Sequence, residues 1–600
     1  MGALDQELAQ ELAAWEARGL TRHEQALEGL VDLVTNDYLS LAQNTRLIEA
    51  ARLAAQQYGA GGRSARLLGG GSELDREVER AAAEWLGAEA GLLFPSGYQA
   101  NIGLVPALVG PGDLVVSDAL NHASLIDGAR LSRARVEVHD HLDADHLEHV
   151  LQQGSNARRR LVLVEGVYSM DGDAPDLALW SRICARHGAS LIVDEAHSLG
   201  LLGPAGAGAW AASDGDPSVL AARLVTGGKA LGAMGAVVVG SAVLREQLVH
   251  RARGFMFSTA VAPAVAGALL AGIEQARSAD RGRDRALGLA RDLAGALGLP
   301  TPAAAIVPIP VGSLESAVQA SKELRAKGLD VRAIRPPTVA PGAECLRVVC
   351  HSHNEPSDLR ALVTTLKELD LPAAGAARQS PPGASPLVVL GTDTDVGKTI
   401  VSAALLRAAS KEGPAHYWKP VQSGPDCDTQ TVKSLSAGEV LEPGCTFDLP
   451  ASPHEAARAE GREVDLAELD RMLGEHLTRP GILVIEPAGG VQVPLTDECL
   501  QLDWLARHRM PCVLVARSGL GTLNHTLLTL ESLERRNLRP RALILVGPPH
   551  PSNHDTLARM SRLPVLELPL LDPLGREAID GWLDEQDLGS VLPTTMVSAR

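Results

Sequence analysis

The sequence predicts an α/β fold in two successive parts, and three patterns support this prediction. Short apolar runs alternate with helical segments over most of the 600 residues, as the buried strands and covering helices of layered α/β domains do. A segment over 371–385 is rich in Pro, Gly and Ala and poor in large apolar side chains, which is typical of an interdomain linker. Beyond it the alternation resumes. We therefore expect a domain over 1–370, a linker over 371–385 and a second domain over 386–600.

The first domain is expected to begin with a helix and to continue as a parallel or mixed sheet. Within residues 1–30, apolar side chains recur at helical spacing from Leu4 to Trp15. Helices are predicted over 74–86 and 175–187. Buried strands are predicted at four apolar runs, which begin at Leu114, Leu161, Leu191 and Ala236.

The region from about 263 to 370 predicts a smaller α+β subdomain. Two strands are expected there, near Val331 and Leu346. Helices are predicted around 264–298, over 314–327 and over 357–369. In the second domain a strand over 387–390 leads into a glycine-containing turn and an Ala/Leu-rich helix, and three later strands are expected to begin at Leu483, Pro511 and Ala542. This order predicts a mostly parallel sheet.

Composition excludes several classes of protein. The formal net charge is -18, whereas proteins that bind nucleic acids or membrane surfaces carry basic patches, so we expect no nucleic acid and no membrane. Seven cysteines are scattered without a CxxC pair, which favours the reducing cytoplasm over a disulfide framework or a zinc site. No apolar run approaches the roughly 18 residues of a membrane span.

The turn between Gly391 and Thr399 has the composition of a phosphate-binding loop. Backbone N–H groups and a helix N-terminus would face an anion, Lys398 would add charge, and the Thr399 hydroxyl would hold Mg²⁺. Five residues separate Gly391 from Gly397, where the usual pattern has four. The alternative is an ordinary strand-to-helix turn.

A lysine, an aspartate and a histidine in the first domain predict a pyridoxal phosphate (PLP) site. Asp194 ends a buried strand, where α/β sheets place ligands, and Lys229 lies in a Gly-rich turn after another strand. PLP needs an amine for its Schiff base and a carboxylate for its pyridinium nitrogen. Taken singly, Lys229 would be a solvated lysine, and His122, which follows a third strand, a structural histidine.

Motifs around these residues extend along the chain from about 30 to 370. They are Thr35-Asn-Asp-Tyr-Leu-Ser-Leu, Gly59-Ala-Gly-Gly-Arg-Ser, Phe94-Pro-Ser-Gly-Tyr-Gln-Ala-Asn, Glu165-Gly-Val-Tyr-Ser-Met-Asp-Gly-Asp and Asp194-Glu-Ala-His-Ser-Leu-Gly. By these motifs the chain resembles the α-oxoamine synthases, PLP enzymes of fold type I. Glu73 and Gly228 depart from the residues common in that family, which leaves fine substrate preference open.

The resemblance implies roles for individual residues. Lys229 would form the Schiff base and remove the α-proton, Asp194 would pair with the pyridine nitrogen, and His122 would stack on the ring. His197 would hydrogen-bond the ring hydroxyl, and Ser169 would lie beside the cofactor. The PLP phosphate would contact Gly97, Tyr98 and Thr226, and the partner subunit's cofactor would contact Thr259. Arg347 would bind the substrate carboxylate, and Asn36 would lie near the substrate. The contact of Thr259 implies a homodimer.

Within the family, the segment Ala333-Ile-Arg-Pro-Pro-Thr-Val-Ala-Pro-Gly resembles that of the 8-amino-7-oxononanoate synthases. They condense alanine with a pimeloyl thioester and release CO₂. The resemblance leaves open whether the acyl carrier is CoA or a carrier protein. It also leaves a related condensation of glycine with acetyl- or succinyl-CoA as the alternative.

In the second domain, three further residues join the phosphate-binding loop. Lys419 follows a predicted strand, Asp428 comes shortly after it, and Glu486 ends another predicted strand. A P-loop Thr with two carboxylates is a reasonable Mg²⁺ shell. Singly, Glu486 would be a capping or surface acid and Asp428 a turn residue.

The second domain resembles the dethiobiotin synthetases over about 386–590. The motifs are Gly391-Thr-Asp-Thr-Asp-Val-Gly-Lys-Thr, Lys419-Pro-Val-Gln-Ser-Gly, Ser452-Pro-His-Glu-Ala-Ala, Glu486-Pro-Ala-Gly-Gly and Leu520-Gly-Thr-Leu-Asn-His-Thr. The five-residue spacing in the loop is normal for that family. It implies carboxylation of 7,8-diaminononanoate by CO₂, phosphorylation by ATP and ring closure.

The same resemblance implies that Lys398 and Lys419 stabilise developing anions and that Thr394 and Ser423 contact the substrate. Thr399, Asp428 and Glu486 would surround Mg²⁺. The nucleotide would contact the loop at Thr392, Asp395, Val396, Gly397 and Thr399. Pro487 replaces a glycine, and Leu545-Val-Gly-Pro-Pro lacks an asparagine that many relatives use to recognise adenine, so nucleotide preference stays open.

Together the two resemblances predict a bifunctional enzyme of biotin synthesis. The two reactions are not consecutive, because the ketone product must be transaminated before the second domain uses it. No second Schiff-base lysine motif is present, so a separate aminotransferase is expected. The alternative for the second domain is a regulatory P-loop switch without catalysis.

Overall fold

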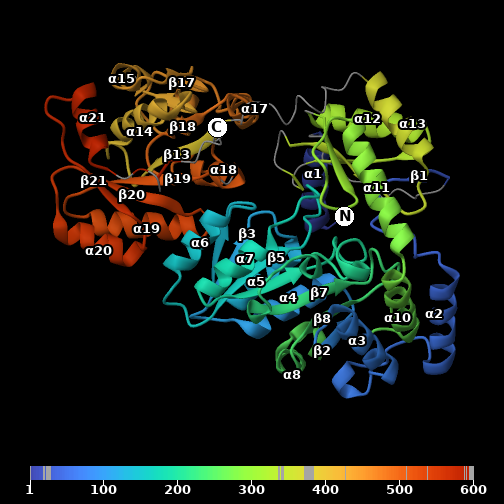
Figure 1. Cartoon of the computed structure of the whole chain (residues 1–600). Helices are drawn as coiled ribbons and strands as arrows, with labels where there is room; N and C mark the ends of the chain where they lie inside the picture. Colours follow the sequence, from blue (N-terminus) through green and yellow to red (C-terminus); the bar gives the residue numbers. More distant parts are fainter. Residues whose placement is uncertain are drawn as a thin grey trace. The chain divides into compact units, whose positions relative to one another are not determined.

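In the computed structural model the chain forms two compact units, Met1–Arg378 and Gln379–Arg600, drawn in Figure 1. The structure describes residues 2–17, 21, 29–311, 313–335, 338–339, 343–369, 384–425, 428–508, 510–536, 538–586, 588 and 591–592. Residues 371–383 of the expected linker, and residues 336–337 and 340–342 of the segment that resembles the 8-amino-7-oxononanoate synthases, lie outside these ranges. Ser385, the last expected linker residue, is the first residue of strand β13.

The first unit is built on a seven-stranded sheet with the order β2-β8-β7-β6-β5-β3-β4. Only β8 runs antiparallel to its neighbours, so the remaining carboxyl ends share one edge. The strands are β2 Ala90–Phe94, β3 Leu114–Asp118, β4 Arg135–His139, β5 Arg160–Glu165, β6 Ser190–Asp194, β7 Leu220–Thr226 and β8 Ala236–Gly240. The sequence predicts a mostly parallel or mixed sheet, and this is confirmed.

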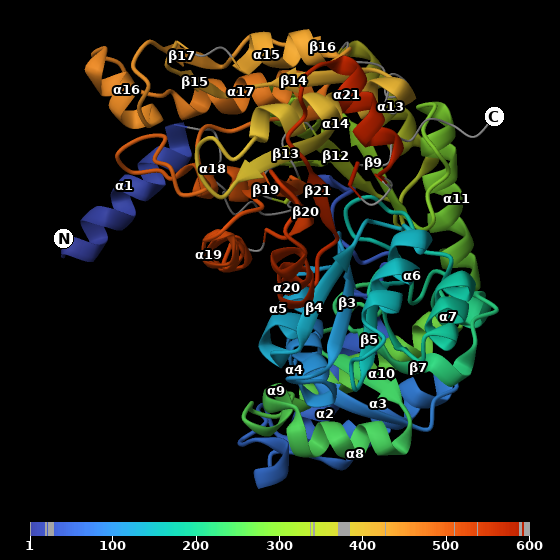
Figure 2. The same cartoon turned by 90° about the vertical axis from the view of Figure 1, so that its left-hand side faces the viewer.

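Both faces of this sheet are buried, because successive side chains along a strand alternate between two apolar cores. Leu163 packs with helices α4, α5 and α8, whereas Val162 and Val164 pack with α6 and α7. Figure 2 shows α4 on one side of β3 and β5 and α6 on the other. The helices are α2 Thr45–Tyr58, α3 Glu73–Leu86, α4 Gly97–Leu108, α5 Ala123–Ser132, α6 Ala144–Gln153, α7 Leu177–Arg186, α8 Ala242–Arg251, α9 Arg253–Met256 and α10 Pro263–Arg277.

The C-terminal part of the first unit carries a three-stranded antiparallel sheet, β11-β12-β9. An N-terminal segment joins it, since β1 pairs with β10 and Val349 N–H donates to Leu33 O at 2.9 Å. The elements are α1 Ala3–Ala17, β1 Val31–Asp32, α11 Asp280–Ala296, β9 Ile306–Pro310, α12 Leu314–Ala326, β10 Leu329–Asp330, β11 Arg332–Ile334, β12 Cys345–Val349 and α13 Pro356–Glu368. The segment after β1 is thereby held beside β12.

The second unit has a seven-stranded, fully parallel sheet with the order β16-β14-β18-β13-β19-β20-β21. Val389 faces a core with α14 and α21, while Leu390 faces one with α17 and α18. The strands are β13 Ser385–Gly391, β14 Ala415–Trp418, β15 Val421–Ser423, β16 Glu439–Val440, β17 Cys445–Phe447, β18 Ile482–Ile485, β19 Cys512–Arg517, β20 Pro540–Val546 and β21 Val565–Leu568. The predicted P-loop architecture is confirmed.

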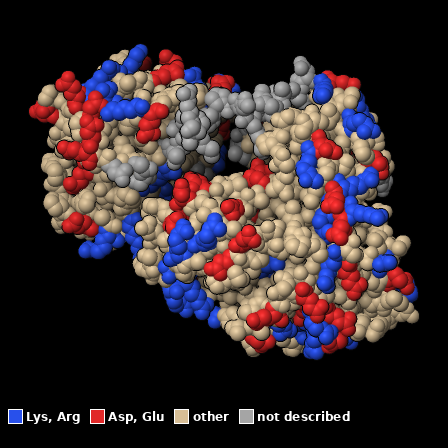
Figure 3. All heavy atoms as spheres, in the orientation of Figure 1, with Lys and Arg blue, Asp and Glu red and all other residues tan. Residues whose placement is uncertain are grey.

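Helices cover both faces of the second sheet, and β15 and β17 form a small parallel pair outside it. The helices are α14 Lys398–Glu412, α15 Asp428–Leu435, α16 Pro453–Ala459, α17 Leu466–Leu477, α18 Gln501–His508, α19 Thr522–Glu534, α20 Pro551–Ser561 and α21 Arg576–Asp584. Within the described ranges, no helix has the length and apolar character needed to cross a membrane. Acidic and basic side chains are interspersed on the surface in Figure 3.

Candidate functional site

The first candidate site lies at the edge of the first unit where the parallel strands end. Asp194 is the last residue of β6 and Thr226 the last residue of β7, and Lys229 follows three residues later. His197 contacts the lysine, since its Nε2 lies 2.6 Å from Lys229 Nζ. The structure therefore brings together two of the residues expected around a PLP ring, Lys229 and His197.

Asp194 is held in place by neutral donors. Its Oδ2 accepts from Asn101 Nδ2 at 2.8 Å, and its Oδ1 accepts from Ala196 N–H at 3.0 Å. The carboxylate is buried, with 4% of its surface exposed. Asn101 was part of a recognised motif, but no role for it could be inferred from the sequence, because its partner lies 93 residues away.

Electrostatics at this site bring the lysine closer to its neutral form. Burial of the amine lowers the pKa of Lys229 to about 8, although the charges of Asp194 and Glu165 oppose the shift. Burial, together with the charges of Lys229 and Arg347, also holds the pKa of His197 well below its usual range. A buried amine with a lowered pKa beside a neutral imidazole suits Schiff-base chemistry.

His122 caps helix α5, and its backbone N–H donates to Glu165 Oε1 at 2.5 Å. Burial lowers the pKa of the imidazole. For Glu165, burial and then the charge of Asp194 raise the pKa to about 8. The sequence did not single out Glu165, which belongs to the same edge of the sheet as Asp194.

The N-terminus of helix α4 forms a small cup. Gly97 is its first residue, and a Cβ there would stand 2.6 Å from the Thr226 methyl carbon. The first amides of a helix have no partner within the helix, which leaves those of Gly97 and Tyr98 available. Among the described residues, the buried Thr226 hydroxyl has no hydrogen-bond partner. An anion-binding helix end with an unpaired hydroxyl fits the phosphate of PLP.

Arg347, on β12, is buried and faces the segment that follows β1. Its Nε donates to Ser169 O at 2.6 Å, and its Nη2 donates to Asn36 Oδ1 at 3.0 Å. Tyr38 links this pair to the lysine, because its hydroxyl lies 2.5 Å from His197 Nδ1. Asn36, Ser169 and Arg347 thus belong to one cluster with His197. No role for Tyr38 was inferred from the sequence.

Thr259, expected to reach a partner subunit's cofactor, is exposed and forms an isolated bridge with Ala65. The adjacent Ala260 N–H donates to Ser64 O at 2.9 Å. The structure therefore places the residue on the surface of the unit, next to the glycine-rich segment 59–64. The role of Thr259 toward a second copy stays a prediction.

The second candidate site is the turn between β13 and α14. Asp395 and Gly397 have positive φ, 54° and 97°, as needed to bend the backbone around an anion. Lys398 Nζ donates to Asp393 O at 3.0 Å, and a Cβ on Gly391 would stand 2.8 Å from the Lys398 side chain. Burial lowers the pKa of Lys398, and the neighbouring Lys419 adds to the shift.

The remaining loop residues predicted to contact nucleotide or substrate lie around this turn. Thr392 N–H donates to Val515 O at 3.0 Å, and Val396 is buried. Thr394 Oγ1 lies 3.4 Å from where a Cβ on Gly489 would stand. Ser423 is the last residue of β15.

Three oxygen-bearing side chains converge behind the loop. Thr399 Oγ1 lies 2.9 Å from both Asp428 Oδ1 and Glu486 Oε1, and its single proton can be donated to either carboxylate. Lys419 pairs with Asp428 and, at 3.2 Å, with Glu486. Burial would lower the pKa of Lys419, but these carboxylates raise it above its usual value. One hydroxyl and two carboxylates match the hard oxygen ligands that Mg²⁺ takes.

Tyr417, for which no role was inferred from the sequence, holds the same glutamate in place. Its buried hydroxyl donates to Glu486 Oε2 at 2.9 Å. Tyr417 lies on β14, next to β18, which ends just before Glu486.

Comparisons with known proteins agree with this division. Residues 28–366 match the class I and II aminotransferases, and residues 385–578 match a family described as an AAA domain. The 8-amino-7-oxononanoate synthase of Anaeromyxobacter dehalogenans is 42% identical over 396 residues, which covers 63% of this chain and 99% of that protein.

Solved structures agree for the first unit. Serine palmitoyltransferase of Sphingomonas wittichii matches with a TM-score of 0.58 at 26% identity, covering 63% of this chain and 100% of that chain. An 8-amino-7-oxononanoate synthase from Francisella tularensis matches with a TM-score of 0.50 at 25% identity, covering 57% and 98%. The chain belongs to the class I and II aminotransferase family, and within it to the 8-amino-7-oxononanoate synthases, with a P-loop domain fused behind.

Proposed function

We propose that the chain is a bifunctional enzyme of biotin synthesis with one activity in each unit. The first unit would condense L-alanine with a pimeloyl thioester to 8-amino-7-oxononanoate. A bond forms between the alanine α-carbon and the thioester carbonyl, while CO₂ and the thiol leave. The observation that carries this proposal is the cluster of Lys229, His197 and Arg347, in a chain 42% identical to an 8-amino-7-oxononanoate synthase over 99% of its length.

Each residue of the first site would have a separate role in binding PLP or the substrate. PLP, when bound, would supply the electron sink for negative charge on the amino-acid α-carbon. Gly97, Tyr98 and Thr226 would hold its phosphate, Asp194 its pyridine nitrogen, and His122 would lie on its ring. Arg347 would bind the alanine carboxylate through its planar guanidinium, and Lys229 would remove the α-proton.

A homodimer is part of the proposal, with Thr259 of each copy reaching the other copy's phosphate cup. Thr259 is exposed, which leaves it accessible to a second copy. Sedimentation of the full chain should give a dimer. Thr259→Ala should then weaken PLP binding without changing the alanine contacts.

Substrate competition tests the first activity. The purified chain should absorb visible light from PLP and release CO₂ with alanine plus pimeloyl-CoA or a pimeloyl carrier protein. Release with glycine plus acetyl- or succinyl-CoA at a higher kcat/KM would instead support the alternative condensation. A chain that binds no PLP would overturn the proposal for the first unit.

For the second unit we propose conversion of 7,8-diaminononanoate, CO₂ and ATP to dethiobiotin. One amine takes up CO₂ as a carbamate, ATP phosphorylates the carbamate, and the second amine displaces phosphate to close the ring. The convergence of Thr399, Asp428 and Glu486 beside Lys398 and Lys419 supports this proposal. Thr399 and the two carboxylates would hold Mg²⁺, and the lysines would stabilise the phosphorylated intermediate.

Nucleotide hydrolysis that depends on the diamine tests the second activity. Dethiobiotin and inorganic phosphate should form in equal amounts, and Lys398→Ala should lower both by about 10²-fold or more. Dimerisation on nucleotide binding without turnover of the diamine would instead identify a regulatory switch. ATP, GTP and CTP should be compared, because adenine recognition is not defined.

A separate aminotransferase must supply the diamine, because neither proposed reaction replaces the ketone of the first product with an amine. Complementation of biotin auxotrophs that lack each step separately tests the division of labour. The chain should rescue strains lacking the first or the last step and fail to rescue the strain lacking the aminotransferase.

A further inference from the structure

The Tyr38 hydroxyl occupies a central position in the first site. The tyrosine side chain is fully buried, with 0% of its surface exposed. Its hydroxyl lies 2.5 Å from His197 Nδ1 and 3.2 Å from Asn36 Oδ1. His197 in turn contacts Lys229 at 2.6 Å, and Asn36 contacts Arg347 at 3.0 Å. Four contacts therefore join the lysine to the arginine through one tyrosine.

The number of donors available determines where each proton lies along this series of hydrogen bonds. Asn36 Oδ1 accepts from Arg347 and, at the same oxygen, from the Tyr38 hydroxyl. The hydroxyl has only one proton, so it accepts from His197 Nδ1–H. A neutral imidazole carries one N–H, which leaves a lone pair on Nε2, toward Lys229 Nζ.

We propose that Tyr38 is a positioning residue of the first site, which sets the orientation and tautomer of His197 beside Lys229 and links this pair through Asn36 to Arg347. The proposal rests on the proposed function, in which Lys229 holds PLP and Arg347 binds the substrate carboxylate. His197 directs the lysine nitrogen, because the Nε2 lone pair accepts an N–H of Lys229. A carboxylate bound to Arg347 would change the contact of Arg347 with Asn36, and through Asn36 the hydrogen bond that the Tyr38 hydroxyl donates.

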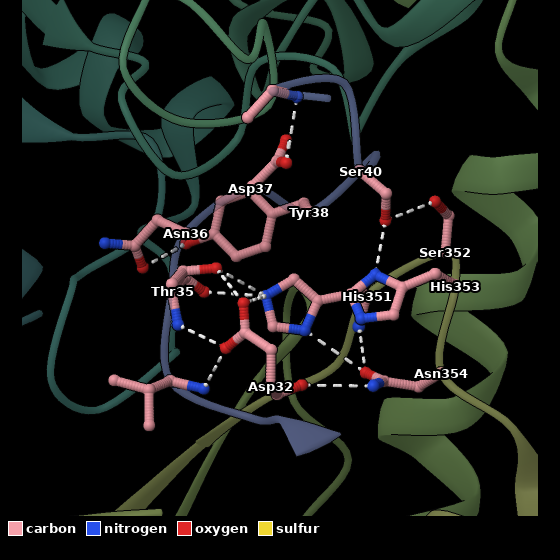
Figure 4. Close-up of polar contacts among 12 residues, drawn as sticks. Asp32, Thr35, Asn36, Asp37, Tyr38, Ser40, His351, Ser352, His353 and Asn354 are labelled. Atoms are coloured by element: carbon pink, nitrogen blue, oxygen red, sulfur yellow. Dashed lines mark hydrogen bonds and ion pairs between the residues drawn. The ribbon is translucent and has the colours of Figure 1, made fainter. Parts of the chain in front are cut away.

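The fold fixes Tyr38 from its backbone side. Figure 4 shows the polar contacts between the segment that carries Tyr38 and residues 351–354. Ser352 N–H donates to Tyr38 O at 2.8 Å. Asp32 Oδ1 accepts from two backbone N–H groups of the following turn, those of Val34 and Thr35, each at 2.9 Å. His351 contacts Thr35 O through Nε2 at 2.8 Å. The segment after β12 therefore holds Tyr38 and is continuous with the strand that carries Arg347.

The positions of charged groups strengthen the case for a defined hydrogen-bond pattern. His197 lies near Lys229, Arg347 and His122, and burial together with these groups keeps its pKa low. Burial also raises the pKa of Tyr38 above its usual value. Both side chains therefore stay neutral near pH 7, and hydrogen bonds rather than charge determine which nitrogen of His197 carries the proton.

Replacing Tyr38 by Phe in the full-length, PLP-loaded chain tests the proposal. Tyr58→Phe is the matched control, because Tyr58 ends helix α2 and packs at the edge of the core. For Tyr38→Phe, the loss of one buried hydrogen-bonding group predicts a rise of about tenfold in KM for alanine. The pH midpoint of the visible absorbance of PLP on Lys229 should shift by about half a unit or more. Tyr58→Phe should change neither.

Asn36→Ala provides a second variant that keeps the tyrosine. It removes the acceptor of the Tyr38 proton, so the hydroxyl is free to donate to His197 Nδ1 and move the imidazole proton to Nε2. The absorbance midpoint should shift here too, even if Tyr38→Phe does not fold. An unchanged midpoint in Asn36→Ala, or an unchanged midpoint and alanine KM in a folded Tyr38→Phe, would overturn the positioning role. A wild-type chain without PLP absorbance would contradict the proposed function instead.

Discussion

Lys229 in the first unit and Lys419 in the second are chemically identical but have opposite surroundings. Lys229 contacts a neutral imidazole, and burial lowers its pKa to about 8. Lys419 contacts the carboxylates of Asp428 and Glu486, and its pKa is raised. Burial disfavours the charge in both cases, so the difference comes from the contacting group.

The comparison separates two uses of a buried lysine. A lysine that forms a Schiff base or removes a proton must be neutral for part of the time. A lysine that stabilises a developing anion must stay charged. The carboxylates of Asp194 and Glu165 act on Lys229 through their charge, whereas those of Asp428 and Glu486 contact Lys419 directly.

The largest expected effect comes from removing Lys229, the proposed Schiff-base lysine. Lys229→Ala should eliminate covalent PLP, which borohydride reduction and intact-mass measurement would detect, and should lower condensation by at least about 10²–10⁴-fold. Lys327→Ala, an exposed lysine of the same unit, is the control. Covalent PLP remaining in Lys229→Ala would assign the Schiff base to another lysine.

The next largest effect is expected from a substitution that impairs the second site alone. Lys398→Ala should reduce diamine-dependent phosphate release by about 10²-fold or more, because a preorganised charge at the phosphates is lost. Lys411→Ala is matched to it, since Lys411 lies on the same helix but pairs with Asp580 at the surface. Condensation by the first unit should be unchanged in both. A loss of condensation in Lys398→Ala would show that the activities are not independent.

The two lysines should also differ in how much their replacement changes the thermal stability of the protein. Lys419→Met leaves Glu486, 1% exposed, without its cationic partner, and breaking such a buried pair costs about 3 kcal/mol or more. For a unit of this size, that lowers Tm by about 6–12 °C. Lys229→Met in PLP-free protein should change Tm by less than about 3 °C, because no carboxylate depends on it for a direct contact. Calorimetry of both variants would contradict this account if the two shifts were equal.

The fold could be predicted from the sequence because strands and helices follow local patterns, and the same patterns indicate candidate reactive residues. Strand ends, glycine turns and the flanking motifs located Lys229, Asp194, Lys398 and Thr399. Side chains that hold these residues could not be predicted in the same way. Asn101 and Tyr38 meet Asp194 and His197 across 93 and 159 residues, and such pairings depend on how helices and loops pack.

The smallest expected effect concerns pH. With a pKa of about 8, the Lys229 amine should be half neutral near pH 8, more than two units below an ordinary lysine. Borohydride trapping of added PLP on PLP-free protein should therefore rise about tenfold per pH unit below 8 and level off above it. Trapping on exposed lysines should keep rising toward pH 10, which provides an internal control in the same peptide map.

Stability should respond to pH with opposite signs in the two units. The folded-state pKa of Lys229 lies below that of the unfolded chain, so the unfolded state binds more protons between about pH 8 and 10.5, and the Lys229 contribution rises with pH in that window. The folded-state pKa of Lys419 is raised. Its contribution is therefore complete below the unfolded pKa of about 10.4 and is lost as pH rises through the folded value. Comparing each wild-type unit with its Lys→Met variant between pH 8 and 11 isolates these contributions, and slopes of the same sign would contradict the distinction between the two lysines.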